Sequence, residues 1–371
     1  RVALVGNYHG TSSRYITVLE GIQDEVGDDV RVYYSEGSHL FRDRLEHLGW
    51  RQDRISEAVN VALNSDVVVL CVGLDETLEG EEGDTGNSYA SGDKVDLLLP
   101  EVQRELIEAV MKVGKPTIIL NMTGSAMDLR FEQEHADAIM QVWYPGARGG
   151  KVIADLLFGK MSPSGKLPIT FYNDTADLPA FEDYSMKGRT YRYLESAPLY
   201  PFGYGLSYGD ADITAVECNG QKVAAGANVA VDTKAGMSIT VEVENKSNME
   251  LGEVVQVYIK DMDSTFATTW GKLCGFARVT VPAGEKVKVA VPMDVDAFTV
   301  VNNEGKKFVD GKKFSVSVGF GQADERTKEL TGKDFSFYPF DIRDKENMRK
   351  IFENHKIDAC IHFAGLKAVG E

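Results

Sequence analysis

The chain has 371 residues, 43% of them hydrophobic and 26% charged, which is the composition of an ordinary soluble globular protein. That length exceeds one typical domain and predicts two domains with a remnant. The formal net charge of −17 repels phosphate backbones and no basic stripe offsets it, so the composition argues against nucleic-acid binding. A neutral substrate such as a sugar is compatible with that charge, although the acidity could equally serve solubility alone.

Membrane, targeting and metal signals are missing from the sequence. No apolar run approaches the roughly 18 residues that a membrane helix needs, so no membrane partner is expected. The opening RVALVG is too short and too quickly polar for a signal peptide, which leaves open whether a longer parent is periplasmic or secreted. The four cysteines lack CxxC spacing and the six histidines form no HExxH cluster, so neither a metal nor another cofactor is expected. Cys71 lies in an apolar run and is predicted to be buried.

Residues 1–209 alternate short apolar, β-branched runs with stretches of helical spacing. Such runs suit strands buried on both faces, and their alternation with helices predicts a mostly parallel α/β/α sandwich. Functional loops in such a sheet follow the carboxyl ends of the strands. The predicted strands are 1–5, 30–34, 67–72, 117–121 and 138–143. The predicted helices are 55–63, 100–113 and 149–158, with Pro100 as a start signal and Gly159 as a stop signal.

From Asp210 the apolar residues recur with period two, and turn clusters separate the runs. Several short strands at this spacing predict an antiparallel β-sandwich of fibronectin III type over residues 210–332. The predicted strands are 238–244, 254–259, 277–281, 287–291 and 314–318. The fold class is therefore α/β, with an α/β/α sandwich followed by a β-sandwich.

The loop after the predicted strand 67–72 reads LDETLEGEEGD and is rich in carboxylates. Cleavage of a glycosidic bond needs one carboxylic acid to protonate the leaving oxygen and a carboxylate on the other side of the sugar. Neighbouring negative charge raises the pKa of the acid, as that role requires. Taken alone the loop is weak support, because a solvated face or a calcium site would look the same.

An ordered series of motifs resembles the α/β-sandwich domain of glycoside hydrolase family 3. The series is DVVVLCVGLDETLEGEE, GDKVDLLLPEVQ, IILNMTGSAMDL, QVWYPGARGGKVIADLLFGKMSPSGKLPITFY and RTYRYLESAPLYPFGYGLSY. GEVVQVYIKD, GFARVTVPAGE and VSVGFG then resemble that family's fibronectin type III-like domain. The resemblance covers roughly residues 1–330 and is specific, because long motifs occur in family order. It implies part of a retaining, exo-acting β-glycosidase of β-xylosidase or β-glucosidase type, with an oligosaccharide or aryl β-glycoside as substrate.

The resemblance assigns roles to several residues. Glu79 matches the family's acid/base glutamate, and Glu82 and Glu81 are close alternatives because the loop varies in length. Asp93 and Lys94 stand where the family often has an Asp-Arg pair that binds substrate; a surface turn is the alternative. Lysine keeps the charge of arginine but loses its bidentate fork.

Trp143 follows a predicted strand and could face a sugar, although aromatic packing inside the domain is the favoured alternative.

The family's nucleophilic aspartate belongs to an amino-terminal (β/α)8 barrel, which would precede Arg1. A retaining pair needs two carboxyl groups about 5–5.5 Å apart, so one carboxylate protonates but cannot trap the cation. We therefore expect this chain alone to be inactive and a barrel domain, in cis or in trans, to be its partner. The LEGEE sequence and the NYHG segment at 7–10 resemble the β-xylosidase branch, which favours xylosides or arabinosides.

Residues 333–371 predict an incomplete βαβ unit, with strands at 335–340 and 359–363 around a helix at 345–355. HFAGLKAVGE and the preceding residues resemble an internal segment of UDP-glucose 4-epimerase, whose matching residues approach NAD. The GxxGxxG loop and the Tyr-xxx-Lys pair are absent, so NAD binding is not expected and a chimeric origin is indicated.

Two other functions stay open at this point. One is a non-catalytic carbohydrate-binding or interaction module, against which the lack of an obvious aromatic row in the β-sandwich weighs. The other is an NAD-linked sugar-nucleotide epimerase fragment, which rests on the tail only.

Overall fold

The computed structural model describes residues 2–42, 49–50, 52–80, 94–333 and 336–341. The chain divides into two compact units. The first comprises Arg1–Lys160 with Phe171–Asp177, and the second Met161–Thr170 with Leu178 onwards. The predicted domain boundaries at 209/210 and 332/333 remain predictions.

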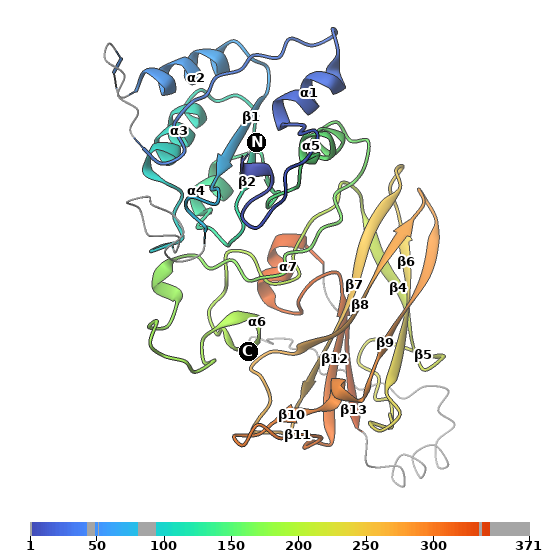
Figure 1. The fold of residues 1–371 in the computed structure, drawn as a ribbon. Helices are drawn as coiled ribbons and strands as arrows, with labels where there is room; N and C mark the ends of the chain where they lie inside the picture. Colours follow the sequence, from blue (N-terminus) through green and yellow to red (C-terminus); the bar gives the residue numbers. More distant parts are fainter. Residues whose placement is uncertain (1, 43–48, 51, 81–93, 334–335, 342–371) are drawn as a thin grey trace, which may run out of the picture. The chain divides into compact units, whose positions relative to one another are not determined.

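The first unit is built on a parallel sheet in the order β1-β2-β3 (Figure 1). Its strands are β1 (Val68–Gly73), β2 (Thr117–Met122) and β3 (Ala138–Gln141). Val68 pairs with Thr117 and Ile118 with Ala138, both in parallel register. These strands confirm the predictions at 67–72, 117–121 and 138–143, although β3 ends at Gln141 and is therefore shorter than predicted. All three carboxyl ends therefore lie at one edge of the sheet.

Helices cover both faces of this sheet, with α1 and α5 on one side and α2 and α3 on the other (Figure 1). The predicted helices are confirmed as α2, α3 and α5, whereas α1 and α4 were not predicted. Gly21 and Gly150 let α1 approach α5 closely, because an added Cβ would lie 2.1 Å and 2.0 Å from backbone oxygens of the facing segment. The bounds are α1 (Val18–Val26), α2 (Asp53–Leu63), α3 (Glu101–Met111), α4 (Arg130–His135) and α5 (Gly149–Leu157).

Two strand predictions in this unit are wrong. In place of the strand predicted at 1–5 stands a short 3-10 helix, η1 (Val2–Leu4). Its Leu4 is buried in the core, and the Leu4 carbonyl accepts a hydrogen bond from the Gly146 amide at 2.6 Å. Residues 30–34 form no strand, and their Tyr34 is 64% exposed, unlike a strand covered on both faces. Both predictions rested on apolar content alone, and neither segment pairs with a strand among the described residues.

The expectation that Cys71 is buried is also wrong, because its side chain is exposed. Cys71 lies on β1, which is the outer strand of the described sheet. An outer strand has a neighbour on one side only, so an apolar run no longer ensures that each side chain is covered.

The second unit is an antiparallel β-sandwich of two four-stranded sheets, in the orders β13-β12-β7-β8 and β5-β4-β6-β9. All five predicted strands are confirmed, as β6, β7, β8, β9 and β12. Alternate residues of β6 are buried, as the period-two pattern predicted. The bounds are β4 (Ala211–Cys218), β5 (Gln221–Val223), β6 (Met237–Asn245), β7 (Leu251–Asp261), β8 (Lys272–Val281), β9 (Lys286–Met293), β12 (Lys313–Gly319) and β13 (Ser336–Asp341).

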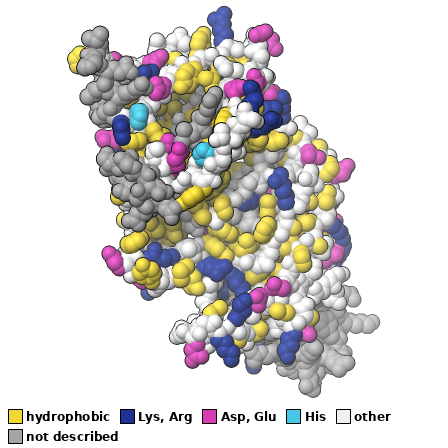
Figure 2. Space-filling view, viewed as in Figure 1, with side chains coloured by type: hydrophobic (Ala, Val, Ile, Leu, Met, Phe, Trp, Pro, Cys, Tyr) yellow, Lys and Arg dark blue, Asp and Glu magenta, His cyan; other side chains and the backbone are white. Residues whose placement is uncertain are grey.

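Short elements complete the second unit. A small hairpin of β10 (Val300–Val301) and β11 (Lys307–Phe308) follows η3 (Val295–Phe298). The other short elements are α6 (Thr190–Tyr193) and α7 (Glu325–Thr331); η2 (Thr175–Asp177) belongs to the first unit. No helix in the described ranges is both long and apolar enough to cross a bilayer. Acidic and basic side chains are interspersed on the face that Figure 2 shows.

The strand predicted at 335–340 is present as β13, which pairs antiparallel with β12 at the edge of the sandwich. The helix predicted at 345–355 and the strand predicted at 359–363 lie outside the described residues. The epimerase resemblance of this segment therefore stays a prediction.

The buried ring of Phe314 packs edge-on against Phe298, with ring centroids 5.3 Å apart. We expect Phe314→Ala to lower the free energy of unfolding by about 3–5 kcal/mol, because it removes buried apolar surface and leaves a cavity. Urea denaturation followed by circular dichroism measures the change. Phe276→Ala is the control, since Phe276 on β8 is 66% exposed. Equal losses in the two variants would show that this core is wrongly assigned.

Candidate functional site

Glu79 lies in a short, anchored turn that follows β1. Leu74 and Leu78 are only 2% and 3% exposed and fix the turn to the core. The carboxylate of Asp75 accepts a hydrogen bond from the Thr77 amide at 2.9 Å, and its carbonyl accepts one from the Glu79 amide at 2.9 Å. The side chain of Glu79 therefore starts from a backbone that local hydrogen bonds already hold.

The loops after β2 and β3 supply donors to the Glu79 carboxylate. The Gly124 amide donates to Oε2 at 2.6 Å, the Tyr144 hydroxyl donates to the same oxygen, and the Ser125 hydroxyl donates to Oε1. Gly124 needs to be glycine, because an added Cβ would lie 2.8 Å from the Tyr144 ring. Loops from the ends of all three parallel strands therefore meet at a single carboxylate, whose side chain is 9% exposed.

Tyr144 is a neutral donor in this arrangement. Burial, and then its hydrogen bond to Glu79, raise the pKa of the Tyr144 phenol above its ordinary value. A phenolate beside a carboxylate would repel it, so the proton stays on Tyr144 throughout the physiological range.

Lys94 is also near Glu79, with Nζ 3.9 Å from Oε1. The ammonium donates to the carbonyl of Ala126 at 3.0 Å and contacts the sulfur of Met127. Burial lowers the pKa of Lys94, and the charges of Glu79 and Asp96 partly oppose that shift. Lys94 is thus a partly buried cation beside the carboxylate rather than part of a surface turn. Asp93, Glu81 and Glu82 lie outside the described residues.

Trp143 packs inside its own unit. Its ring meets the buried ring of Phe171 edge-on, with centroids 6.3 Å apart. Its backbone has φ of +56°, in the left-handed region where a bulky residue is strained. That turn leads directly into Tyr144, so the strained residue redirects the chain just before the donor to Glu79.

Gln103 is an important residue that the sequence prediction missed. It is 3% exposed on α3, and its side-chain oxygen accepts from the Gly73 amide at 2.8 Å. Its Nε2 donates to the carbonyls of Gly73 at 2.7 Å and Leu40 at 2.6 Å. Gly73 ends β1, so one side chain satisfies both backbone groups where the loop that carries Glu79 begins. The sequence feature that could have predicted this role is a glutamine next to the apolar stripe of a helix.

A pair of amide side chains, Asn121 and Gln141, joins the ends of β2 and β3. Asn121 donates to the side chain of Gln141 at 2.6 Å, and Gln141 donates to the Thr123 carbonyl at 3.0 Å. Asn121 is fully buried. These bonds fix the spacing of the strands from which Gly124 and Tyr144 come.

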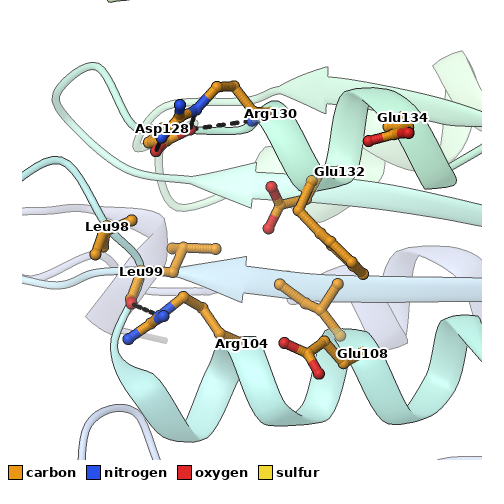
Figure 3. Close-up of a pocket in the computed structure, with 10 residues that line it drawn as sticks. Leu98, Leu99, Arg104, Glu108, Asp128, Arg130, Glu132 and Glu134 are labelled. Atoms are coloured by element: carbon orange, nitrogen blue, oxygen red, sulfur yellow. Dashed lines mark hydrogen bonds and ion pairs between the residues drawn. The ribbon is translucent and has the colours of Figure 1, made fainter. Parts of the chain in front are cut away.

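A cavity of about 390 Å³ lies elsewhere in this unit, between α3 and α4 (Figure 3). Figure 3 shows Glu132 and Arg104 approaching it from opposite helices. Glu132 is 4% exposed, and burial is the main cause that raises its pKa, with Arg104 among the groups that oppose the rise. Glu79 is not among the residues that line this cavity, so we do not assign the chemistry to it.

The fold and site together define an α/β sandwich whose strand-end loops present a held carboxylate, followed by a β-sandwich. Residues 1–208 match the glycosyl hydrolase family 3 C-terminal domain, and residues 253–322 match the fibronectin type III-like domain. The chain belongs to glycosyl hydrolase family 3, as its motifs predicted.

Named relatives agree with that assignment. The chain is 32% identical to a periplasmic β-glucosidase of Salmonella typhimurium, over 85% of its own length and 42% of the relative's. It is 33% identical to a β-xylosidase of Formosa agariphila, over 89% and 43%. Among solved structures, a β-glucosidase of Erythrobacter marinus matches with a TM-score of 0.73 and 27% identity, over 90% and 44%. The chain thus spans less than half the length of these relatives.

We expect Gln103→Ala to lower the free energy of unfolding by about 2–4 kcal/mol, because it leaves buried amide and carbonyl groups of the backbone without partners. Urea denaturation measures the loss. Gln23→Ala on α1 is the matched control, since Gln23 is exposed in a helix of similar length. If both variants are equally stable, Gln103 does not hold the end of β1.

Replacing Glu132 tests the cost of a buried carboxylate. Because the pKa of Glu132 is raised in the folded state, folding binds its proton more tightly, and stability falls as pH rises past the unfolded value of about 4.3. We therefore expect Glu132→Gln to raise the melting temperature at neutral pH, with the gain vanishing below that pH. The control is Glu134→Gln, an exposed position in the same helix. A gain that persists in acid would contradict the titration of Glu132 as its cause.

Proposed function

We propose that this chain provides the acid/base part of a retaining, exo-acting β-glycosidase of β-xylosidase or β-glucosidase type, with Glu79 as the proton donor. The observation that supports the proposal is the Glu79 carboxylate, held by donors from loops that follow β2 and β3. Ligands of open parallel sheets bind beyond the carboxyl ends of the strands, which is where this carboxylate lies.

Glu79 would act twice in such a reaction. Protonated, it gives its proton to the glycosidic oxygen as the bond breaks; ionised, it takes a proton from the water that releases the sugar. The hydroxyls of Ser125 and Tyr144 suit both states, because a hydroxyl donates to a carboxylate and can turn to accept from a carboxylic acid. The Gly124 amide can only donate, so it fixes the position of Oε2.

Lys94 has a different effect on Glu79. Its ammonium lies 3.9 Å from Oε1 and places a positive charge beside the carboxylate. The lysine is itself held by the Ala126 carbonyl, and this contact keeps the cation beside the carboxylate without a direct bidentate pair. We propose that Lys94, with Asp93, also contacts the substrate.

The second carboxylate belongs to a partner domain in this proposal. A retaining mechanism needs a nucleophile about 5–5.5 Å from Glu79, and the family resemblance places it on a (β/α)8 barrel, in cis or in trans. The substrate would be an oligosaccharide or aryl β-glycoside. The relatives are named as β-glucosidases and β-xylosidases, and the LEGEE sequence leads us to propose the xyloside.

The test combines the purified chain with a barrel half from a family relative. We expect no hydrolysis of nitrophenyl-β-xyloside or nitrophenyl-β-glucoside by the chain alone, and hydrolysis when the halves are combined. Glu79→Gln should then lower kcat on xylobiose about 100-fold or more. The loss on the nitrophenyl substrate should be smaller, because nitrophenolate leaves without protonation.

Glu76→Gln, in the same loop, is the matched control and should retain activity. A combined enzyme that keeps its rate on xylobiose with Glu79→Gln, but loses it with Glu81→Gln or Glu82→Gln, would transfer the acid/base role to that residue. Robust hydrolysis by the chain alone would show that the barrel is dispensable.

A further inference from the structure

The β-sandwich unit contains a cavity of about 310 Å³ whose lining holds more basic than acidic side chains. It lies where α6, the end of β7, the start of β8, η3 and the β10–β11 hairpin come together. Its volume is at the lower end of the range for small-molecule sites, about the size for one sugar ring or a similar molecule. The charged residues that line it are Arg192, Lys260, Lys272, Lys307, Asp261 and Asp296.

The cations of this cavity are poorly neutralised. Lys307 forms an ion pair with Asp296 at 2.5 Å. Within the described residues, no carboxylate lies within 4.0 Å of the charged groups of Arg192, Lys260 or Lys272. The carboxylate of Asp261 instead accepts from backbone amides, among them that of Gly311 at 2.7 Å.

Lys272 shows the effect of this crowding. Its ammonium donates to the carbonyls of Asp296 and Thr299, each at 2.7 Å. Burial lowers the pKa of Lys272, and the positive charges of Arg192 and Lys307 lower it further, against opposing effects of Cys274 and Asp296. In a chain of net charge −17, such a gathering of like charges is not a result of composition. An anion between them would relieve the repulsion.

Arg192 is the cation best placed to meet such an anion. Its side chain lies over the Tyr191 ring, 5.6 Å from the centroid, and Nε donates to the Tyr191 hydroxyl at 3.3 Å. These contacts orient the guanidinium, and its terminal nitrogens form no hydrogen bond with any residue that the structure describes. That planar fork matches a carboxylate.

The remaining lining is mostly apolar and aromatic, with Thr268 and Thr299 as further polar residues. Phe266 is 37% exposed and meets Phe308 edge-on, with centroids 6.0 Å apart. Ile259 and Val301 add aliphatic surface. A cavity lined by both cations and an aromatic ring suits a ligand that combines a carboxylate with a ring bearing C–H faces.

We propose that this cavity binds a carboxylate-bearing monosaccharide, that is, a uronate unit of an acidic glycan. Arg192 and Lys272 contact the carboxylate, and Phe266 covers one face of the ring. The site would serve to hold acidic glycans, and it does not depend on the assignment of Glu79.

Isothermal titration calorimetry of the full chain tests the proposal. Glucuronate should bind, glucose should bind at least about tenfold more weakly because it lacks the carboxylate, and added salt should weaken glucuronate binding. Inorganic phosphate distinguishes a general anion site: binding as tight as that of glucuronate would overturn the uronate assignment. Equal binding of glucose, or no binding of glucuronate, would overturn the proposal altogether.

Variants locate the site. Arg192→Gln should weaken glucuronate binding about tenfold or more, and Arg192→Lys should restore part of the loss, since it keeps the charge without the fork. Lys288→Gln on β9 is the control: it removes the same charge from the same unit, at a residue paired with Glu217 and absent from the cavity lining. Melting temperatures confirm that each variant is folded. Equal losses in Lys288→Gln and Arg192→Gln would contradict a local site.

Discussion

The structure of the first unit depends on one requirement: a nearly buried carboxylate must be given hydrogen-bond donors. Glu79 receives them from Gly124, Ser125 and Tyr144, which belong to loops after β2 and β3. Those loops can reach it only because the strands are parallel and neighbouring, so that their carboxyl ends coincide. The sheet order is thus a condition for the site, and the amide pair of Asn121 and Gln141 keeps the strand ends in place.

The same requirement applies to the backbone that carries Glu79. β1 is the outer strand of the described sheet, and its last residue would lack partners on one side. Gln103 supplies both a donor and an acceptor to Gly73, as a neighbouring strand would. A helix side chain thereby replaces a strand at the point where the loop departs. The position of Glu79 thus depends on Gln103, a residue that holds the backbone of β1 from a neighbouring helix.

Much of this arrangement could be predicted from the sequence, and the exceptions have physical reasons. Strands of both units were predicted correctly because burial leaves a pattern of apolar residues. Burial on both faces gives a continuous apolar run, and burial on one face gives apolar residues at every second position. The strand predicted at 1–5 failed because composition does not say whether a ladder partner exists. Glu79 was proposed through motifs, and its role stays a prediction. Gln103 and Tyr144 were missed because hydrogen bonds across 30 and 65 residues of sequence leave no local pattern.

The two units solve opposite electrostatic problems. In the first unit, the Glu79 carboxylate is held mainly by uncharged donors. Among the described residues, Lys94 at 3.9 Å is the only cation that forms an ion pair with it. In the second, Arg192, Lys260 and Lys272 gather with carbonyl oxygens and a phenol as partners. Uncharged partners hold a charged group in position without neutralising it. Both arrangements therefore suit charged groups that interact with a bound ligand.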